Sequence, residues 1–387
     1  MRLGTDVLFE RQLLRGRTVG IVCNPASVDH ALTHVLARAE AAGVRIGAIF
    51  GPQHGLQSNL QDNMIESPHA NDARRQVPVY SLYSETREPN AEMLRGLDAL
   101  VIDLQDVGTR IYTYIYTMAN CLRAAAKHGL PVVVCDRPNP IDGVTVEGPM
   151  LVPGFESFIG QFPIPMRHGM TIGELARLFN EHFAIGAKLE VVALEGWQRH
   201  QYFDETGLTW VLPSPNLPTL DAAVVYPGTV LFEGTNVSEG RGTTKPFELI
   251  GAPWVTDPDA FAAALNARAI PGVHFRAHAF EPTFQKHARV TCGGIQAHVT
   301  DRRAFPAVET GVALIDAFRR ADPAQFAWRQ PPYEYEYEKL PIDILAGSTA
   351  TREALESGAD PHDIALSWRQ DVEAFQILRK RFLLYPS

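Results

Sequence analysis

Amides, carboxylates, tyrosines and a histidine follow the short apolar runs of the first 140 residues, at the points where these runs end. Side chains of these types hydrogen-bond sugar hydroxyls, aromatic rings stack on sugar faces, and a pair of carboxyl groups cleaves a glycosidic bond. This composition is typical of a carbohydrate cleft. The residues of this group that we expect there are Asn24, Gln53, His54, Asn63, Glu66, Tyr83, Asp106, Arg110, Tyr112, Asp136, Arg137 and Asn139.

A second polar cluster lies at residues 232–245, where three glycines are interspersed among the charged residues. Its candidate site residues are Glu233, Asn236, Glu239 and Arg241. Their close spacing favours a rigid polar loop that forms a lid or wall of the cleft. The alternative is a solvated loop in which the glutamates and the arginine pair with one another.

Several of these residues also have a purely structural interpretation. Asp106 and Asp136 follow apolar runs, a position at which an aspartate often caps a helix. His54 lies between Gln53 and a glycine and could bond a loop carbonyl. The pattern as a whole therefore carries more weight than any one residue.

The elements that would position these side chains are short strands alternating with helices. Their apolar runs are continuous rather than alternating, which indicates a parallel sheet covered on both faces. We expect a doubly wound, Rossmann-like α/β domain over residues 1–225, with ligands bound beyond the carboxyl ends of the strands. Its predicted strands are Thr18–Cys23, Arg45–Phe50, Val77–Leu82, Asp98–Leu104 and Pro131–Cys135, with helices at Tyr114–His128 and Thr171–Phe183.

The rest of the chain, residues 226–387, has a different pattern and predicts a smaller α+β domain that closes the cleft. We expect strands at Val230–Phe232 and Ala288–Gly293, and a helix at Pro258–Ala267. The segment Tyr333–Glu338 reads YEYEYE, a period of two that predicts a half-buried strand.

Composition and missing motifs exclude several classes of function. The net charge is −9, which disfavours nucleic-acid and membrane partners, since both require a basic surface. No glycine-rich fingerprint follows the first strand and no metal-binding motif occurs, so we expect neither a cofactor nor a metal. The start of the chain lacks a signal sequence, and the four cysteines are widely spaced, so we expect a cytoplasmic protein.

Seven segments of the chain resemble the NamZ-type exo-β-N-acetylmuramidases, a family long catalogued as a domain of unknown function. The resemblance covers nearly the whole chain. It implies a Rossmann-like catalytic domain, a smaller C-terminal domain, and release of N-acetylmuramic acid (MurNAc) from the non-reducing end of peptidoglycan fragments. We add Asn216, in the fifth segment, to the expected substrate-binding residues. The segments are Phe50–Ser67, Pro78–Pro89, Leu97–Met118, Cys135–Leu151, Ser214–Thr219, Tyr226–Glu248 and Tyr333–Ser348.

The chain departs from this family at one position. Characterised members resemble Pro-Glu-His-Gly after the second strand, and that glutamate is the favoured catalytic carboxyl. Here Gln53 stands in its place, and an amide cannot exchange a proton as a carboxyl does. We therefore expect Glu66, buried in the cleft, to be the acid, with Asp106 or Glu233 as its partner and His54 hydrogen-bonded to the site.

The expected substrate is a muropeptide or the disaccharide MurNAc-GlcNAc, where GlcNAc is N-acetylglucosamine. One of three arginines, Arg110, Arg137 or Arg241, would pair with the lactyl carboxylate of muramic acid. Two alternatives stay open because of Gln53: a glycosidase for another N-acetylated or acidic sugar, and a non-catalytic muropeptide-binding protein.

Overall fold

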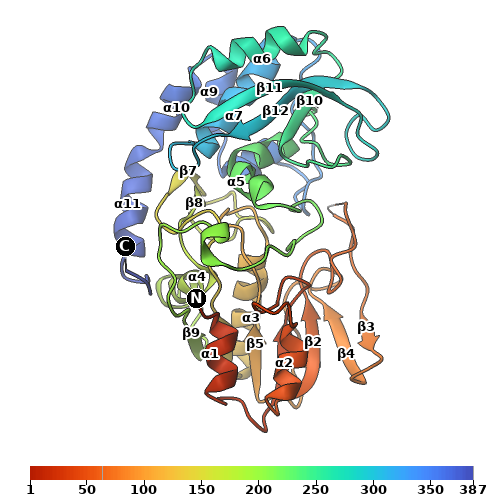
Figure 1. Cartoon of the computed structure of the whole chain (residues 1–387), viewed down its shortest axis with the longest axis vertical. Helices are drawn as coiled ribbons and strands as arrows, with labels where there is room; N and C mark the ends of the chain where they lie inside the picture. The colour runs from red at the N-terminus through yellow and green to blue at the C-terminus, as the bar shows by residue number, and fades with distance from the viewer. Residues whose placement is uncertain (63, 387) are drawn as a thin grey trace.

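A seven-stranded sheet forms the centre of the first half of the chain, and its strands follow the order β3-β4-β2-β1-β5-β6-β9. The computed structural model describes residues 1–62 and 64–386 (Figure 1). All neighbouring strands are parallel except β3, which pairs antiparallel with β4 at one edge. The strands are β1 (Thr18–Val22), β2 (Arg45–Gly51), β3 (Ala70–Asp72), β4 (Val77–Ser81), β5 (Ala99–Ile102), β6 (Val132–Cys135) and β9 (Leu189–Val192).

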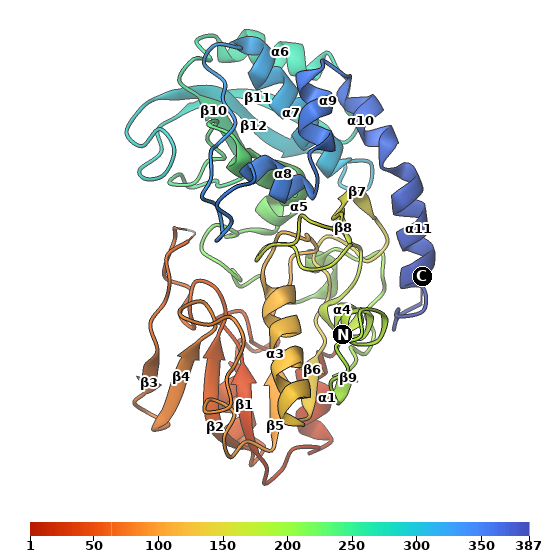
Figure 2. The same ribbon diagram turned by 180° about the vertical axis from the view of Figure 1, so that it is seen from behind.

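Helices cover both faces of this sheet, as the continuous apolar strands predicted (Figures 1 and 2). Helices α1 (Gly4–Glu10) and α2 (Val35–Ala41) pack on one face. Helices α3 (Tyr114–His128) and α4 (Ile172–Arg177) pack on the other. The doubly wound α/β architecture is thus confirmed, and α3 spans the predicted residues.

The second half contains a three-stranded antiparallel sheet in the order β10-β12-β11. Helix α11 then runs back alongside the first half, so the two halves meet at more than one place (Figures 1 and 2). The strands are β10 (Leu249–Ala252), β11 (Val273–Phe280) and β12 (Cys292–Val299), and the helices are α5 (Leu220–Thr229), α6 (Pro258–Asn266), α7 (Ala307–Ala321), α8 (Pro341–Ala346), α9 (Ala350–Glu356), α10 (Pro361–Ser367) and α11 (Arg369–Arg379).

A few short elements complete the chain. Strands β7 (Glu147–Met150) and β8 (Pro165–Arg167) form a two-stranded sheet between the halves. The 3-10 helices are η2 (Phe203–Thr206) and η3 (Val230–Gly234), and a π-helical turn, η1 (Leu178–His182), follows α4. The proposed division of the chain at residue 225 falls inside α5, where the helix is continuous.

Two predicted strands are wrong, and a third, Ala288–Gly293, overlaps β12 only at its last two residues. Residues 230–232 belong to the 3-10 helix η3, which continues α5. Residues 333–338 form a loop, with only an isolated bridge between Tyr333 and Glu336. Its period of two does not separate an inner from an outer face, because Tyr333 and Glu334 are both buried. Glu334 and Tyr335 instead adopt positive φ angles of 45° and 68°.

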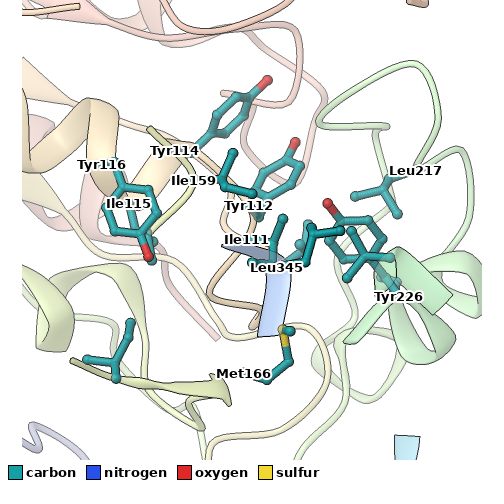
Figure 3. Close-up of a cluster of buried hydrophobic side chains, with 14 of the residues drawn as sticks. Ile111, Tyr112, Tyr114, Ile115, Tyr116, Ile159, Met166, Leu217, Tyr226 and Leu345 are labelled. Carbon is teal, nitrogen blue, oxygen red and sulfur yellow. The ribbon is translucent and has the colours of Figure 1, made fainter. Parts of the chain in front are cut away.

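Part of the molecular core lies where the halves meet. Figure 3 shows Tyr112, just before α3, between Tyr114 at the start of that helix and Tyr226 of α5. The ring centroids of Tyr112 and Tyr114 are 4.6 Å apart, and those of Tyr112 and Tyr226 are 6.3 Å apart. Among the described residues, no helix has the length and hydropathy that crossing a lipid bilayer requires.

Candidate active site

A cavity lies between the two halves of the chain, beyond the carboxyl ends of the parallel strands. The first half contributes the loop after β2, the start of α3 and an irregular connector, and the second half contributes three polar segments. The lining residues are Gln53, His54, Ile111, Tyr112, Thr113, Tyr114, Ile159, Ser214, Asn216, Leu217, Tyr226, Glu233, Arg241, Phe247, Tyr333 and Glu334.

Glu334 presents a buried carboxyl group to this cavity. The Tyr83 hydroxyl donates to its Oε2 at 3.0 Å, and the Gln53 amide donates to its Oε1 at 3.4 Å. Burial, followed by the negative charge of Glu233, raises the pKa of Glu334 to about 7, although the two hydrogen bonds oppose this shift. A substantial fraction of Glu334 therefore carries a proton at neutral pH.

Glu233, the second carboxyl group of the cavity, has the opposite electrostatic environment. Arg241 Nη2 donates to its Oε1 at 2.6 Å, and the Tyr333 hydroxyl donates to its Oε2 at 2.6 Å. Burial alone would raise the pKa of Glu233, but the guanidinium and the hydroxyl outweigh it and hold the pKa below the ordinary value. Glu233 is thus ionised while Glu334 is partly protonated.

Arg241 is fixed by a second buried carboxylate behind the cavity. Its Nε lies 3.3 Å from Glu239 Oε1, and Lys286 Nζ donates to Glu239 Oε2 at 2.8 Å. Glu239 does not line the cavity, so its expected contact with substrate is replaced by a role in orienting Arg241. The predicted alternative, local pairing of glutamate and arginine, is present, but it occurs in a buried wall rather than in a solvated loop.

His54 bonds a loop carbonyl and also lines the cavity, so its structural and its functional interpretation are compatible. Its Nδ1 lies 2.7 Å from the Leu60 carbonyl oxygen, which can only accept, so Nδ1 carries the hydrogen. Burial lowers the pKa of His54 to about 4, and the ring is therefore neutral at pH 7. A neutral ring with its proton on Nδ1 leaves Nε2 as a hydrogen-bond acceptor on a side chain that lines the cavity.

Two of the four expected catalytic residues lie together at the cavity with some of the expected binding residues. His54 and Glu233 line the cavity, as do the expected binding residues Gln53, Tyr112, Asn216 and Arg241. Tyr83 contacts the cavity through Glu334. Asn63 lies outside the described residues.

The expectation that Glu66 is buried in the cleft is wrong. Its side chain is 48% exposed and lies outside the cavity. The Arg87 guanidinium is 3.2 Å away, and the Tyr335 hydroxyl donates to Glu66 at 3.0 Å. Glu66 therefore holds the loop that carries Glu334.

Asp106 is buried but does not line the cavity either. Its Oδ2 accepts from the Gly108 backbone N–H at 2.8 Å and lies 3.2 Å from His168 Nε2. The turn after β5 therefore uses this carboxyl group, which favours Glu233 over Asp106 as the catalytic partner.

Two of the three candidate arginines form hydrogen bonds and ion pairs inside the protein. Arg110 is fully buried and donates to backbone carbonyls, including those of Ile164 at 2.9 Å and Leu345 at 2.8 Å. Arg137 forms a two-pronged ion pair with Asp103. Neither lines the cavity, and Arg241 is the one candidate of the three that does.

The other four expected binding residues also satisfy backbone groups or buried side chains. Asp136 accepts from Thr171, Gly173 and Tyr385, and burial raises its pKa to about 7. None of the four lines the cavity, and each has hydrogen-bond partners within the fold. The remaining three are Asn24, bonded to the Tyr114 hydroxyl and the Pro213 carbonyl, Asn139, bonded to the Met170 carbonyl, and Asn236, bonded to the Gln325 carbonyl.

Glu334 was absent from the residues expected at the site. The signal was present in the sequence, since the YEYEYE segment repeats a carboxylate beside a phenol. Interpretation of this segment as a half-buried strand obscured the signal, because it treated the alternation as packing rather than as chemistry.

Comparison with known proteins assigns the whole chain to one family. Residues 19–221 match "Exo-beta-N-acetylmuramidase NamZ, N-terminal" and residues 224–385 match the corresponding C-terminal family. The peptidoglycan β-N-acetylmuramidase NamZ of Bacillus subtilis (strain 168) is 44% identical over 388 residues, which cover 100% of this chain and 91% of that protein.

Solved structures agree with this assignment. Two crystal structures of DUF1343 family proteins from Bacteroides fragilis NCTC 9343 superpose with TM-scores of 0.89 and 0.80, at 32% and 28% sequence identity. Each comparison covers 100% of this chain and 99% of the other. The chain therefore belongs to the NamZ family of exo-β-N-acetylmuramidases.

Proposed function

We propose that this protein is a glycoside hydrolase that releases N-acetylmuramic acid from the non-reducing end of peptidoglycan fragments. One observation carries the proposal beyond family membership: the cavity contains two carboxyl groups whose surroundings drive their pKa values in opposite directions. Such a pair supplies the proton donor and the ionised partner that hydrolysis of a glycoside needs.

Glu334 acts as the general acid in this proposal. A partly protonated carboxyl group with a pKa of about 7 transfers its proton effectively to the departing glycosidic oxygen near neutral pH. Tyr83 and Gln53 each donate one hydrogen bond to it and so fix the direction of the carboxyl group. In this proposal Gln53 does not exchange the proton itself, so its amide is compatible with the reaction.

Glu233 acts as the ionised partner. The transition state of glycoside hydrolysis has the character of an oxocarbenium ion, and a carboxylate beside it stabilises the positive charge. Arg241 and the Tyr333 hydroxyl hold Glu233 in its charged form. The same Arg241 guanidinium lines the cavity and is the cation that we propose to meet the lactyl carboxylate of muramic acid.

The test is incubation of the purified protein with MurNAc-GlcNAc, with the products identified by mass spectrometry. We expect release of free MurNAc and GlcNAc, and a loss of about 10²- to 10⁴-fold in kcat/KM for Glu334→Gln. Glu338→Gln, an exposed position of the same loop, is the matched control and should retain activity. Binding of the disaccharide without any product would contradict hydrolysis and favour the non-catalytic alternative.

We also infer that the protein works in a reducing compartment, as the expected cytoplasmic location requires. The four cysteines, Cys23, Cys121, Cys135 and Cys292, are all unpaired and buried. Unpaired thiols are usual where glutathione and thioredoxin keep cysteine reduced. Fractionation of cells that express the native gene, followed by detection of the protein, tests this location.

A further inference from the structure

A second, more open depression, which we call the outer groove, shares the lining residue Asn216 with the cavity. It is lined by Gln61, Pro215, Asn216, Pro218, Gly242, Thr243, Thr244, Pro246, Leu249, His278, Phe280, Glu281, Thr283 and Phe284. Nothing in the hydrolytic pair requires this groove, which raises the question of what occupies it.

Two segments separate the cavity from the outer groove, and each contributes to both. In the connector, Ser214 and Leu217 line the cavity, Pro215 and Pro218 line the groove, and Asn216 lines both. In the polar loop, Arg241 lines the cavity while the next three residues line the groove. The two spaces are therefore adjacent compartments of one binding region, and Asn216 lies at their junction.

The walls of the outer groove are held in place by hydrogen bonds between loops, one within each half of the chain. Asn216 Nδ2 donates to the Gln61 carbonyl at 2.6 Å, and the Thr283 backbone N–H donates to the Gly242 carbonyl at 2.9 Å. Gly242 has a φ of +80°, and a Cβ there would lie 2.7 Å from the Phe284 carbonyl oxygen. This position requires glycine for the two loops to meet, and the groove is therefore pre-formed.

The chemistry of the lining identifies the class of ligand. Phe280, Phe284 and the prolines give flat apolar surfaces, and Thr243, Thr244 and the Asn216 amide give hydroxyl and amide groups. Rings together with hydrogen-bonding groups suit a sugar, and Glu281 and His278 add one carboxyl group and one imidazole to the same lining. No lysine or arginine occurs among the described lining residues, so a peptide with several carboxylates would find no cation there.

We infer that the outer groove is the subsite for the leaving sugar, a neutral N-acetylated hexosamine joined to the muramic acid that occupies the cavity. This inference rests on the proposed function, because it assigns one side of the scissile bond to each compartment. The glycosidic oxygen then lies near Asn216, between the two compartments.

The experiment compares two substrates that share MurNAc but differ in the leaving group. MurNAc-GlcNAc fills both compartments, whereas the β-glycosyl fluoride of MurNAc has a single leaving atom and does not reach the outer groove. Thr244→Trp places a large ring in the groove at an exposed position. Thr300→Trp is the matched control, since Thr300 is also exposed and lines a different depression.

For Thr244→Trp we expect the ratio of kcat/KM for the disaccharide over the fluoride to fall by at least about tenfold relative to wild type. Thr300→Trp should keep the wild-type ratio. An equal loss on both substrates, or no loss on either, would overturn the subsite. If the wild-type protein hydrolyses neither substrate, the proposed function fails, and calorimetry then decides the subsite: Thr244→Trp must weaken binding of the disaccharide but not of MurNAc alone, and equal binding would overturn it.

Discussion

At the scale of single residues, the hydrogen bond between Gln53 and Glu334 determines how the site handles protons. Gln53 receives a bond from Thr113 at 2.8 Å and donates to Glu334 at 3.4 Å, so the orientation of its amide is fixed. This bond lowers the pKa of Glu334, against the larger effect of burial. The residue at position 53 therefore affects the pKa of Glu334 but does not itself donate the proton.

This arrangement predicts the dependence of activity on pH. The acid must be protonated, so kcat/KM of the wild-type protein should fall above about pH 7 as Glu334 loses its proton. Gln53→Glu removes a favourable bond and adds a third carboxyl group to the cavity, and both changes raise the pKa of Glu334. The basic limb should therefore move to higher pH in a rate profile, whereas the added charge of Gln57→Glu, at an exposed position, should leave it in place. A basic limb that moves to lower pH would contradict the assignment.

At the scale of elements, the loop at residues 333–338 is held by Arg87 and Glu66 of the first half of the chain, a pair that we call the clasp. The Arg87 guanidinium lies 3.8 Å from the centre of the Tyr335 ring and 3.2 Å from Glu66. Positive φ angles at Glu334 and Tyr335 are unfavourable for residues other than glycine, and they persist only where the surroundings enforce them. We therefore treat Arg87 as a positioning residue for Glu334.

Removal of the clasp should affect catalysis more than binding. For Arg87→Ala we expect kcat to fall by roughly 10- to 100-fold, because a small displacement of the acid is costly, while KM changes little. Arg87→Lys should restore only part of the rate, since an ammonium group lacks the planar stacking of guanidinium. Steady-state kinetics at several pH values measure both effects, with Arg95→Ala, an exposed site, as the control. A rise in KM at unchanged kcat would exclude a positioning role.

Some elements could be predicted from the sequence alone, and others could not. The parallel strands and α3 were predictable because continuous apolar runs and helical periodicity are local signals. The loop at 333–338 was not, since its conformation is imposed by Arg87 and Tyr83, which lie about 250 residues earlier in the chain. Arg110 and Asp136 were misassigned for the same reason: their partners Leu345 and Tyr385 lie in the other half.

At the scale of the whole molecule, both halves contribute to the site, whereas the resemblance implied that the first domain is the catalytic one. Both proposed reacting carboxyl groups, Glu233 and Glu334, come from the second half, and the first half supplies Gln53, Tyr83 and the neutral His54 around them. The relative position of the halves therefore sets the geometry of the acid, and the contacts between them away from the cavity matter for activity.

The C-terminal segment provides one such contact. The Tyr385 hydroxyl donates to the buried Asp136 carboxyl group at 2.5 Å, and Arg379 donates to the Val144 carbonyl at 2.7 Å. Tyr385→Phe leaves Asp136 without this donor, so the free energy of unfolding should fall by about 1–3 kcal/mol. Urea denaturation measures the loss, and Tyr337→Phe, at a 70% exposed position, is the control. An unchanged free energy of unfolding would show that this bond does not stabilise the fold.

The most direct test of the central claim, that Glu334 is the acid and Glu233 its ionised partner, uses leaving groups of different quality. A 2,4-dinitrophenolate leaves without protonation, whereas the sugar of MurNAc-GlcNAc needs an acid. The account predicts that Glu334→Gln loses activity on the disaccharide but retains most of it on dinitrophenyl β-MurNAc, and that Glu233→Gln loses activity on both. Equal losses on both substrates for Glu334→Gln, or no loss at all, would contradict the account.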